Sequence, residues 1–389
     1  MEQIYTPELI GELNQKRILT VIREEGPLSR ADICRRVSLS FPAVSANVKV
    51  LLERDLLRAQ GAGNNAVGRK SVLLGFNADY GYLAALRLGR RDATEMLCNL
   101  DGEPLNIRTA DIGQQFTDLR QIQEHIVSLS GALLEESGIP REKVLCVSVS
   151  LPGAMDSDTG EFYMVPYLPQ IRRDALVSAI QEVFGGVPVL FENNVNNGAL
   201  GEQWRGAGKG FQDIFYFHYD IGMGGALILN NELYKGSHRA AGEIGYMLLG
   251  AGALRSKFLA EGAAEKLLSG HAILSMLQES GLAESLEAWF DACDSGSRRA
   301  LEALRPLVEG VGILLVNVTS ALDPQIIILA GSIGRRIFRH ARAEWVKMLG
   351  THVPYVPQIV CSEMEGTESL YGAVKVGLAY LSGRNFQIE

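Results

Sequence analysis

The spacing of apolar residues predicts that the chain begins with three short helices. From residue 6 to residue 25, apolar side chains recur every three or four positions, which is the period of a helix with one buried face, and Gly26-Pro27 ends this helix. Ser29 is placed to cap a second helix that ends at Val37, and Ser40 to cap a third. Short helices joined by a tight turn predict a helix-turn-helix.

A strand–loop–strand pattern follows the helices. Residues 56–76 read LLRAQGAGNNAVGRKSVLLGF, in which two apolar strands flank a Gly/Asn-rich loop ending in Arg69 and Lys70. Such a hairpin is typical of the wing of a winged helix, and two cations at its tip can lie on phosphates or enter a groove. We therefore expect residues 1–76 to form a winged helix-turn-helix DNA-binding domain. A small helical domain with a solvated loop is the alternative.

The third helix carries small and polar residues on the face opposite its apolar stripe. Small and amide side chains let a helix approach base edges closely. The candidate DNA-binding residues are Ser40, Pro42, Ala43, Ser45, Asn47 and Lys49 of this helix, together with Arg69 and Lys70 of the wing.

Charge is distributed unevenly along the chain. The 389 residues carry a net charge of −8, yet residues 1–75 hold 11 Lys and Arg against 8 Asp and Glu. A basic module on an acidic body favours a polyanionic partner for the module alone. No apolar run approaches about 18 residues, the start lacks a secretory-signal pattern, and the five cysteines are scattered. We therefore expect a cytoplasmic protein with reduced thiols and no membrane association.

From residue 77 onward, apolar strands alternate with amphipathic helices. This alternation predicts an α/β body of two lobes with a cleft between them, and we place lobe 1 at 77–203 and lobe 2 at 204–389. Where one predicted strand ends, residues 191–202 read FENNVNNGALGE, a carboxylate followed by four amides. Amides donate and accept hydrogen bonds, so the cluster suits a ligand covered in hydroxyls. An amide cannot take a proton from a hydroxyl, so binding is favoured over catalysis.

Long motifs carry a family resemblance. A winged helix followed by LPGAMD, ENNVNNGALGE, GMGGALILNNELYKG, AAGEIGYM and DPQIIILAGS resembles the ROK family (repressors, open reading frames and sugar kinases), in particular its branch with an N-terminal DNA-binding domain, such as xylose repressors. The resemblance covers nearly the whole chain. It implies an actin-like ATPase/sugar-kinase fold for the body, with the last helix returning to lobe 1, and a homodimer or dimer of dimers.

The chain departs from the kinases of that family at the positions that handle phosphate. Arg87–Arg91 stand where the kinases have Asp-x-Gly-Gly-Thr, and we expect Arg90 to fill the space of a glycine. At the second phosphate loop, Asp220 would repel phosphate, and the side chain of Ile221 cannot donate a hydrogen bond to it. Asn194 matches the catalytic aspartate of the family but has no basicity near neutral pH.

The zinc and sugar contacts of the family are only partly retained. Tyr246 replaces a histidine ligand, and no cysteine lies between Cys146 and Cys293, so we expect no zinc site. Asn193 and Glu243 match sugar contacts, although Glu243 is alternatively structural. The candidate ligand-binding residues are Gly153, Asn193, Asn194, Glu243 and Tyr246.

These features predict a DNA-binding transcriptional regulator, a repressor, that is not an enzyme. Its catalytically dead body is expected to dimerise and to sense a small sugar-like ligand, with no metal and no other cofactor. The expected partner is a two-fold symmetric double-stranded DNA operator. Two alternatives stay open: a body that is a ligand-free dimerisation scaffold, and an active sugar kinase.

Overall fold

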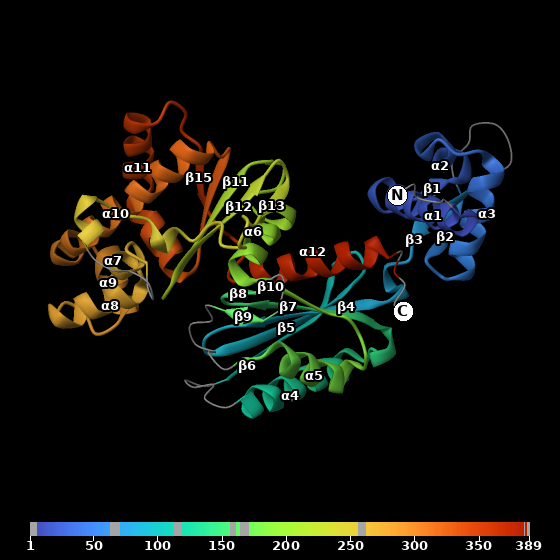
Figure 1. Ribbon diagram of the computed structural model, residues 1–389, viewed down its shortest axis with the longest axis horizontal. Helices are drawn as coiled ribbons and strands as arrows, with labels where there is room; N and C mark the ends of the chain where they lie inside the picture. Colours follow the sequence, from blue (N-terminus) through green and yellow to red (C-terminus); the bar gives the residue numbers. More distant parts are fainter. Residues whose placement is uncertain are drawn as a thin grey trace.

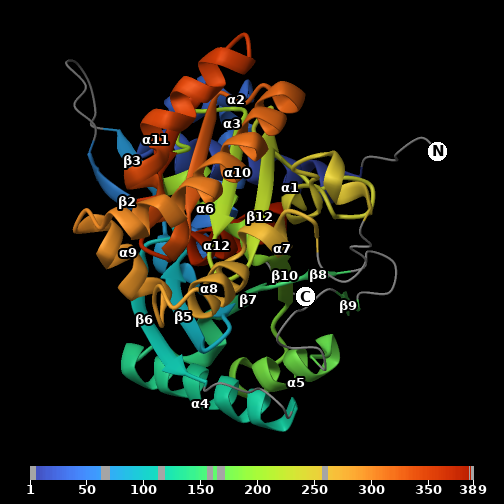
Figure 2. The same ribbon diagram turned by 90° about the vertical axis from the view of Figure 1, so that its left-hand side faces the viewer.

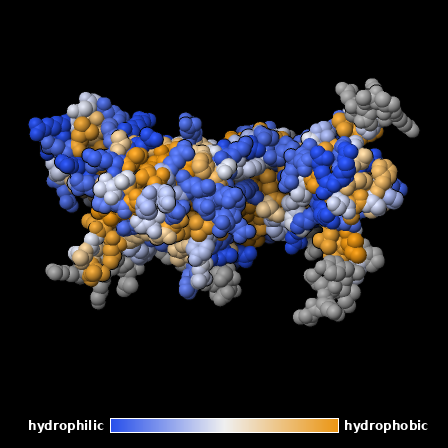
Figure 3. Space-filling view, turned by 90° about the horizontal axis from the view of Figure 1, so that it is seen from above, coloured by the Kyte–Doolittle hydropathy of each residue, from blue (hydrophilic) through white to orange (hydrophobic). Residues whose placement is uncertain are grey.

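The computed structural model describes residues 6–62, 71–112, 119–155, 161–163, 171–255, 262–384 and 386. A winged helix stands at one end, and two α/β lobes follow it (Figure 1). The view from above shows that the molecule is elongated, with the winged helix at one tip (Figure 3). The predicted fold class is confirmed.

The N-terminal module has the three helices and the hairpin that the sequence predicts. Ser29 forms a capping box with Asp32, and Ser40 caps the third helix. The strands form a sheet in the order β1-β3-β2. Its elements are α1 (Pro7–Glu25), β1 (Leu28–Ser29), α2 (Arg30–Val37), α3 (Phe41–Glu53), β2 (Leu57–Ala62) and β3 (Val72–Phe76).

Lobe 1 is a five-stranded sheet in the order β10-β7-β4-β5-β6. The strands β4, β5 and β6 form an antiparallel meander, and β7 and β10 join it in parallel. Its strands are β4 (Tyr82–Leu88), β5 (Asp92–Asn99), β6 (Pro104–Asp111), β7 (Val144–Leu151) and β10 (Val189–Asn193), with the small pair β8 (Ala154–Met155) and β9 (Phe162–Tyr163) beside them. The helices α4 (Leu119–Ser137) and α5 (Arg173–Phe184) cover one face (Figure 2).

Lobe 2 repeats the plan with a sheet in the order β13-β12-β11-β14-β15. Its strands are β11 (Ile214–Tyr219), β12 (Met223–Leu229), β13 (Glu232–Tyr234), β14 (Ile326–Ala330) and β15 (Gln358–Cys361). Its helices are α7 (Glu265–Leu268), α8 (Gly270–Glu279), α9 (Leu286–Asp294), α10 (Arg298–Leu322) and α11 (Ser332–His352). No helix in the described part of the chain is long and apolar enough to cross a membrane.

Two helices cross between the lobes. The helix α6 (Asn194–Arg205) follows the last strand of lobe 1 but packs on β11 and β12 of lobe 2, so the expected division at 203/204 falls in its last turn. The final helix α12 (Glu368–Gly383) follows lobe 2 but packs on β4 and β7 of lobe 1. The two helices also pack on each other, at the point where the lobes meet (Figure 1).

Candidate functional site

The helix α3 presents a solvent-facing surface on the winged helix. Its apolar side, with Val44, Val48 and Leu51, is fully buried in the core of the module. Pro42 and Lys49 are exposed on the opposite side, and Ala43, Ser45 and Asn47 are half-buried. The expected residues therefore share one accessible surface. Arg69 and Lys70 lie outside the described residues.

Several of these polar side chains also have partners within the helix. The hydroxyl of Ser40 accepts the Ala43 N–H at 3.4 Å as the N-cap. The amide of Asn47 donates to the Ala43 carbonyl at 2.9 Å, and Lys49 lies 3.7 Å from the Glu53 carboxylate. An exposed pair of this kind is worth little, so Lys49 can exchange its partner for a phosphate.

Phe41 is a residue of this surface that the sequence interpretation missed. It is the first residue of α3 and is 57% exposed, although large aromatic side chains are usually covered. An aromatic ring at the end of a helix that enters a groove can contact a thymine methyl group. Its position directly after the Ser40 cap already indicated that Phe41 lies at the exposed start of the helix.

A small pocket lies at the carboxyl ends of β7 and β10. It encloses ≈ 20 Å³ and is lined by Leu151, Gly153, Met155, Phe162, Phe191, Glu192, Asn193, Asn196 and Arg239. Arg239 comes from lobe 2, so the pocket lies between the lobes. This volume has room for one or two water molecules. A sugar could enter this pocket only if the residues that line it moved apart.

Asn193 is the N-cap of α6. Its side-chain oxygen accepts the N–H groups of Val195 at 2.7 Å and Asn196 at 3.1 Å. Its side-chain nitrogen donates to the Gly153 carbonyl at 2.6 Å. The structure thus brings Gly153 and Asn193 together as expected, but most of the hydrogen-bonding capacity of Asn193 is used inside the protein.

Glu192 joins the two lobes by an ion pair with Lys235, which follows β13. The side chain of Glu192 is 9% exposed and that of Lys235 is 34% exposed. The same carboxylate accepts the Asn193 N–H at 3.1 Å and the Asn196 side-chain amide at 3.0 Å. A buried carboxylate needs such partners. Glu192 is therefore a structural residue, and the sequence pattern alone did not reveal its partner in lobe 2.

The other three candidate ligand residues lie outside the described wall of the pocket. Asn194 is half-buried at the start of α6. Glu243 precedes the short turn Ile244–Tyr246, whose last residue is Tyr246, and both residues are exposed. Although Glu243 is exposed as a whole, desolvation of its carboxyl group by the surrounding protein raises the pKa, and the charge of Glu265 raises it further.

At the two turns that resemble the phosphate loops of the family's kinases, charged side chains bond within the chain itself. Arg87 pairs with Asp92 and lies 3.0 Å from the Thr94 hydroxyl. Arg90 is exposed, and the tight β4–β5 turn places the Asp92 carboxylate against Gly89. In lobe 2, Asp220 accepts the hydroxyl of Ser332 at 2.9 Å and its N–H at 3.3 Å, at the N-terminus of α11. A phosphate at the second turn would meet the negative charge of Asp220.

The residues present do not fit a zinc site. Tyr246 stands where a histidine ligand is expected, and the free cysteines lie far apart along the chain. No group of three or more His, Cys, Asp or Glu side chains that could hold a metal ion occurs in the part of the chain that the structure describes.

A winged helix packed on two α/β lobes, with a small pocket between the lobes, defines a DNA-binding module carried by a kinase-like body. The chain belongs to the ROK family, whose model matches residues 83–376. A model of the MarR family matches residues 12–66, which cover most of the winged helix.

Three relatives show how far the similarity extends along the chain. A putative xylose repressor from Caldicellulosiruptor sp. (strain Rt8B.4) is 27% identical over 339 residues, which are 82% of this chain and 83% of that protein. The crystal structure of a ROK family transcriptional regulator, a homologue of the E. coli MLC protein, superposes with a TM-score of 0.77 at 20% identity and covers 96% of this chain and 98% of its own. The ROK hexokinase from Thermus thermophilus superposes with a TM-score of 0.64 at 21% identity, over 78% of this chain and 99% of its own. The body therefore has the fold of the family's kinases.

Proposed function

We propose that the protein is a DNA-binding transcriptional repressor of the cytoplasm whose kinase-derived body dimerises and binds a small sugar-like ligand. The observation that carries the proposal is the accessible face of α3 on a winged helix that is packed against a ROK body. The alignment with a putative xylose repressor over both parts supports it. Two modules of a dimer would bind the two halves of a symmetric operator.

Selection of binding sites from random double-stranded DNA tests the DNA-binding function. We expect the full-length protein to enrich a two-fold symmetric sequence, because a dimer presents two copies of α3. Enrichment of no sequence would contradict the proposal.

Phe41→Ala is expected to weaken binding to the selected operator roughly tenfold, because an apolar contact with a base edge is lost. Binding to random DNA should change little, since phosphate contacts supply it. Fluorescence anisotropy with both DNAs measures the difference. Val50→Ala, which shortens another exposed side chain of α3, is the matched control. Equal weakening on operator and random DNA would exclude a base-reading role for Phe41.

We further propose that the body is not an enzyme. Asp92 and Asp220 at the two phosphate positions and the amide of Asn194 in place of a base support this proposal. The alternative, an active sugar kinase, would hydrolyse ATP in a sugar-dependent manner in a coupled assay with glucose, N-acetylglucosamine or xylose.

The proposed ligand is a small neutral sugar held by Gly153, Asn193, Asn194, Glu243 and Tyr246 when the walls of the pocket rearrange. Glu243→Gln is expected to lower the affinity for xylose, glucose or N-acetylglucosamine, whichever binds in a thermal-shift screen, by roughly tenfold. Operator affinity without sugar should stay unchanged. Glu232→Gln, an exposed exchange on β13, is the control. If none of the sugars binds, the ligand-free scaffold becomes the better hypothesis.

A further inference from the structure

The winged helix meets the body at a cluster of one cation and two aromatic rings. The guanidinium carbon of Arg23 lies 5.1 Å from the ring centroid of Phe76 and 5.2 Å from that of Phe386. The two ring centroids are 5.2 Å apart. Each of the three side chains, which we call the Arg23 cluster, therefore lies close to the other two. They come from the last turn of α1, the end of β3 and the residues that follow α12.

The two rings of the Arg23 cluster are buried, Arg23 is half-buried between them and the surface, and the cluster is bonded to lobe 1. Phe386 is 1% exposed and Phe76 is 9% exposed. The guanidinium of Arg23 donates to the carbonyl oxygen of Leu100, between β5 and β6, at 2.9 Å. Attraction between a cation and a ring face is stronger when water is excluded. One continuous apolar core surrounds the cluster and includes residues of the winged helix, lobe 1 and α12.

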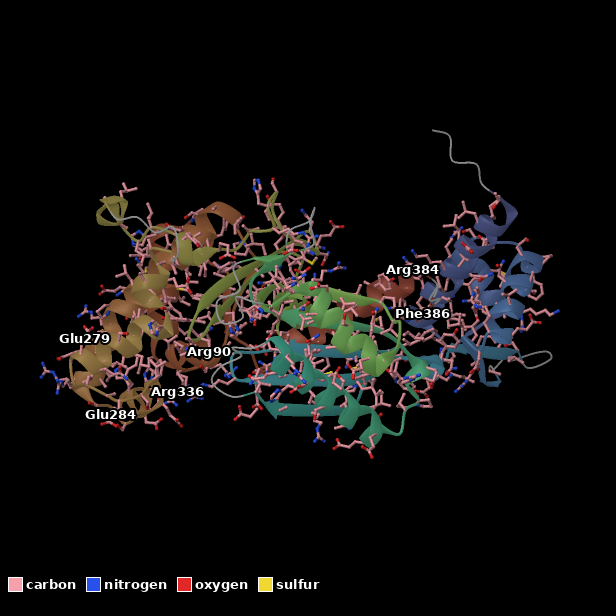
Figure 4. All side chains as sticks on the ribbon, turned by 60° about the horizontal axis from the view of Figure 1, so that its bottom comes forward. Arg90, Glu279, Glu284, Arg336, Arg384 and Phe386 are labelled. Carbon is pink, nitrogen blue, oxygen red and sulfur yellow. The ribbon has the colours of Figure 1, made fainter. Side chains whose placement is uncertain are left out.

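The position of Phe386 follows the end of α12. Its N–H donates to the Leu381 carbonyl in the last turn of that helix at 2.8 Å. Figure 4 shows Phe386 and Arg384 together at the boundary between the body and the winged helix, whereas Arg90 lies toward the other end of the body. A shift of α12 would therefore be passed to Phe386 and, through Arg23, to α1.

The helix α12 is in turn held by α6, which begins at the interlobe pocket. Added Cβ atoms at Gly201 or Gly372 would overlap the backbone of the facing helix, so the two helices touch backbone to backbone. Lys375 donates to the Gln203 side chain at 2.6 Å beside this contact. The N-cap of α6 is Asn193 of the pocket wall. A continuous series of packed elements thus connects the pocket to the Arg23 cluster.

We propose that Arg23 is a positioning residue that fixes the winged helix on the end of α12 and thereby sets the separation of DNA half-sites that the protein binds. The proposal rests on the proposed function, because the separation of half-sites matters only to a dimer with two winged helices on one operator.

The test uses full-length Arg23→Gln and Phe386→Ala on the operator selected from random DNA. Binding is measured to the selected spacing, to spacings changed by two base pairs, and to a single half-site. We expect the wild-type affinity to fall roughly tenfold or more on altered spacings, because the half-sites rotate relative to each other. The affinity of the two variants should fall by less than roughly threefold on the same altered spacings. Their affinity for a single half-site should equal that of the wild type.

Matched variants separate positioning from general damage. Arg384→Gln is the same chemical exchange two residues from Phe386, and its guanidinium contacts the Tyr380 ring instead of the cluster; it should keep the wild-type spacing dependence. Arg23→Lys keeps a cation beside the rings and should restore part of that dependence.

The positioning role is overturned if Arg23→Gln or Phe386→Ala keeps the full spacing dependence, or if Arg384→Gln loses it as well. If Phe386→Ala loses half-site binding because it does not fold, Phe386→Leu, which keeps apolar bulk without a ring face, decides the question in the same assay. If the wild type enriches no DNA sequence, the proposed function fails instead, so the two failures are distinguishable.

Discussion

Gly372→Ala is expected to destabilise the protein by about 3 kcal/mol or more, because α6 and α12 meet through their backbones at this residue. A Cβ atom added at Gly372 would lie closer than 3.0 Å to backbone atoms of Asn197. The backbones of two packed helices cannot give way as the end of a flexible side chain can. The helices would have to separate, and with them the two lobes that they join.

Gly377→Ala provides the control on the same helix. A Cβ atom there would lie 3.4 Å from the Cys146 sulfur, an ordinary contact. Alanine favours a helix over glycine by up to about 1 kcal/mol, so this variant should be as stable as the wild type or more stable. Urea unfolding followed by circular dichroism compares the two variants. Equal stability of both would show that α6 and α12 are not in backbone contact.

Local signals explain why the winged helix was predictable. Ser29 and Ser40 each precede a helix that their side chains cap, and Gly26 caps the end of α1. Such caps act within a few residues of the chain, so they can be recognised without knowledge of the tertiary structure. The strands of the body were predictable for a related reason, since each is an apolar run that is long enough to be buried.

The amide cluster shows where the same reasoning stops. Asparagine is favoured both as a helix N-cap and as a sugar contact, because its amide can bond either to backbone N–H groups or to hydroxyl groups. The sequence indicated the second role for Asn193, and the structure shows the first. Only the turn from β10 directly into α6 distinguishes the roles, and the apolar pattern did not reveal that this helix begins at Asn194.

Partners that are distant along the chain have no sequence signal at all. Glu192 pairs with Lys235 across the lobes, and Arg23 meets Phe386 at the other end of the chain. Each contact depends on how separate elements are placed by the fold. These contacts hold the lobes and the winged helix together, so the most informative features for regulation were the least predictable from the sequence.

Two turns of the body hold carboxylates that bond to groups of the chain itself. Asp92 holds the side chain of Arg87, and Asp220 supplies the negative charge at the N-terminus of α11. A helix N-terminus favours an anion, and here a carboxylate of the chain provides it. These internal pairs support the proposal that the body is not an enzyme.

One carboxyl group is buried between the sheet of lobe 1 and α4. Glu95 of β5 is fully buried, and the Ser130 hydroxyl donates to one of its oxygens at 2.7 Å. The other oxygen has no hydrogen-bond partner among the described residues. Burial raises the pKa of Glu95 to about 8, although the bond from Ser130 opposes the rise. At neutral pH the folded protein therefore keeps this proton, whereas the unfolded chain releases it.

Glu95→Gln is expected to flatten the pH dependence of stability. Between the ordinary pKa of 4.5 and about 8, the folded state binds more protons than the unfolded state, so the free energy of unfolding falls as the pH rises. This contribution to the free energy of unfolding is fully present below pH 4.5 and lost above about pH 8. It amounts to roughly 3 to 5 kcal/mol. Urea titrations from about pH 5 to about pH 8.5 should show the fall in the wild type and not in the variant. Ser130→Ala, which removes the bond that favours the charged form, should extend the fall to higher pH. Equal slopes in the wild type and Glu95→Gln would show that another group governs the dependence.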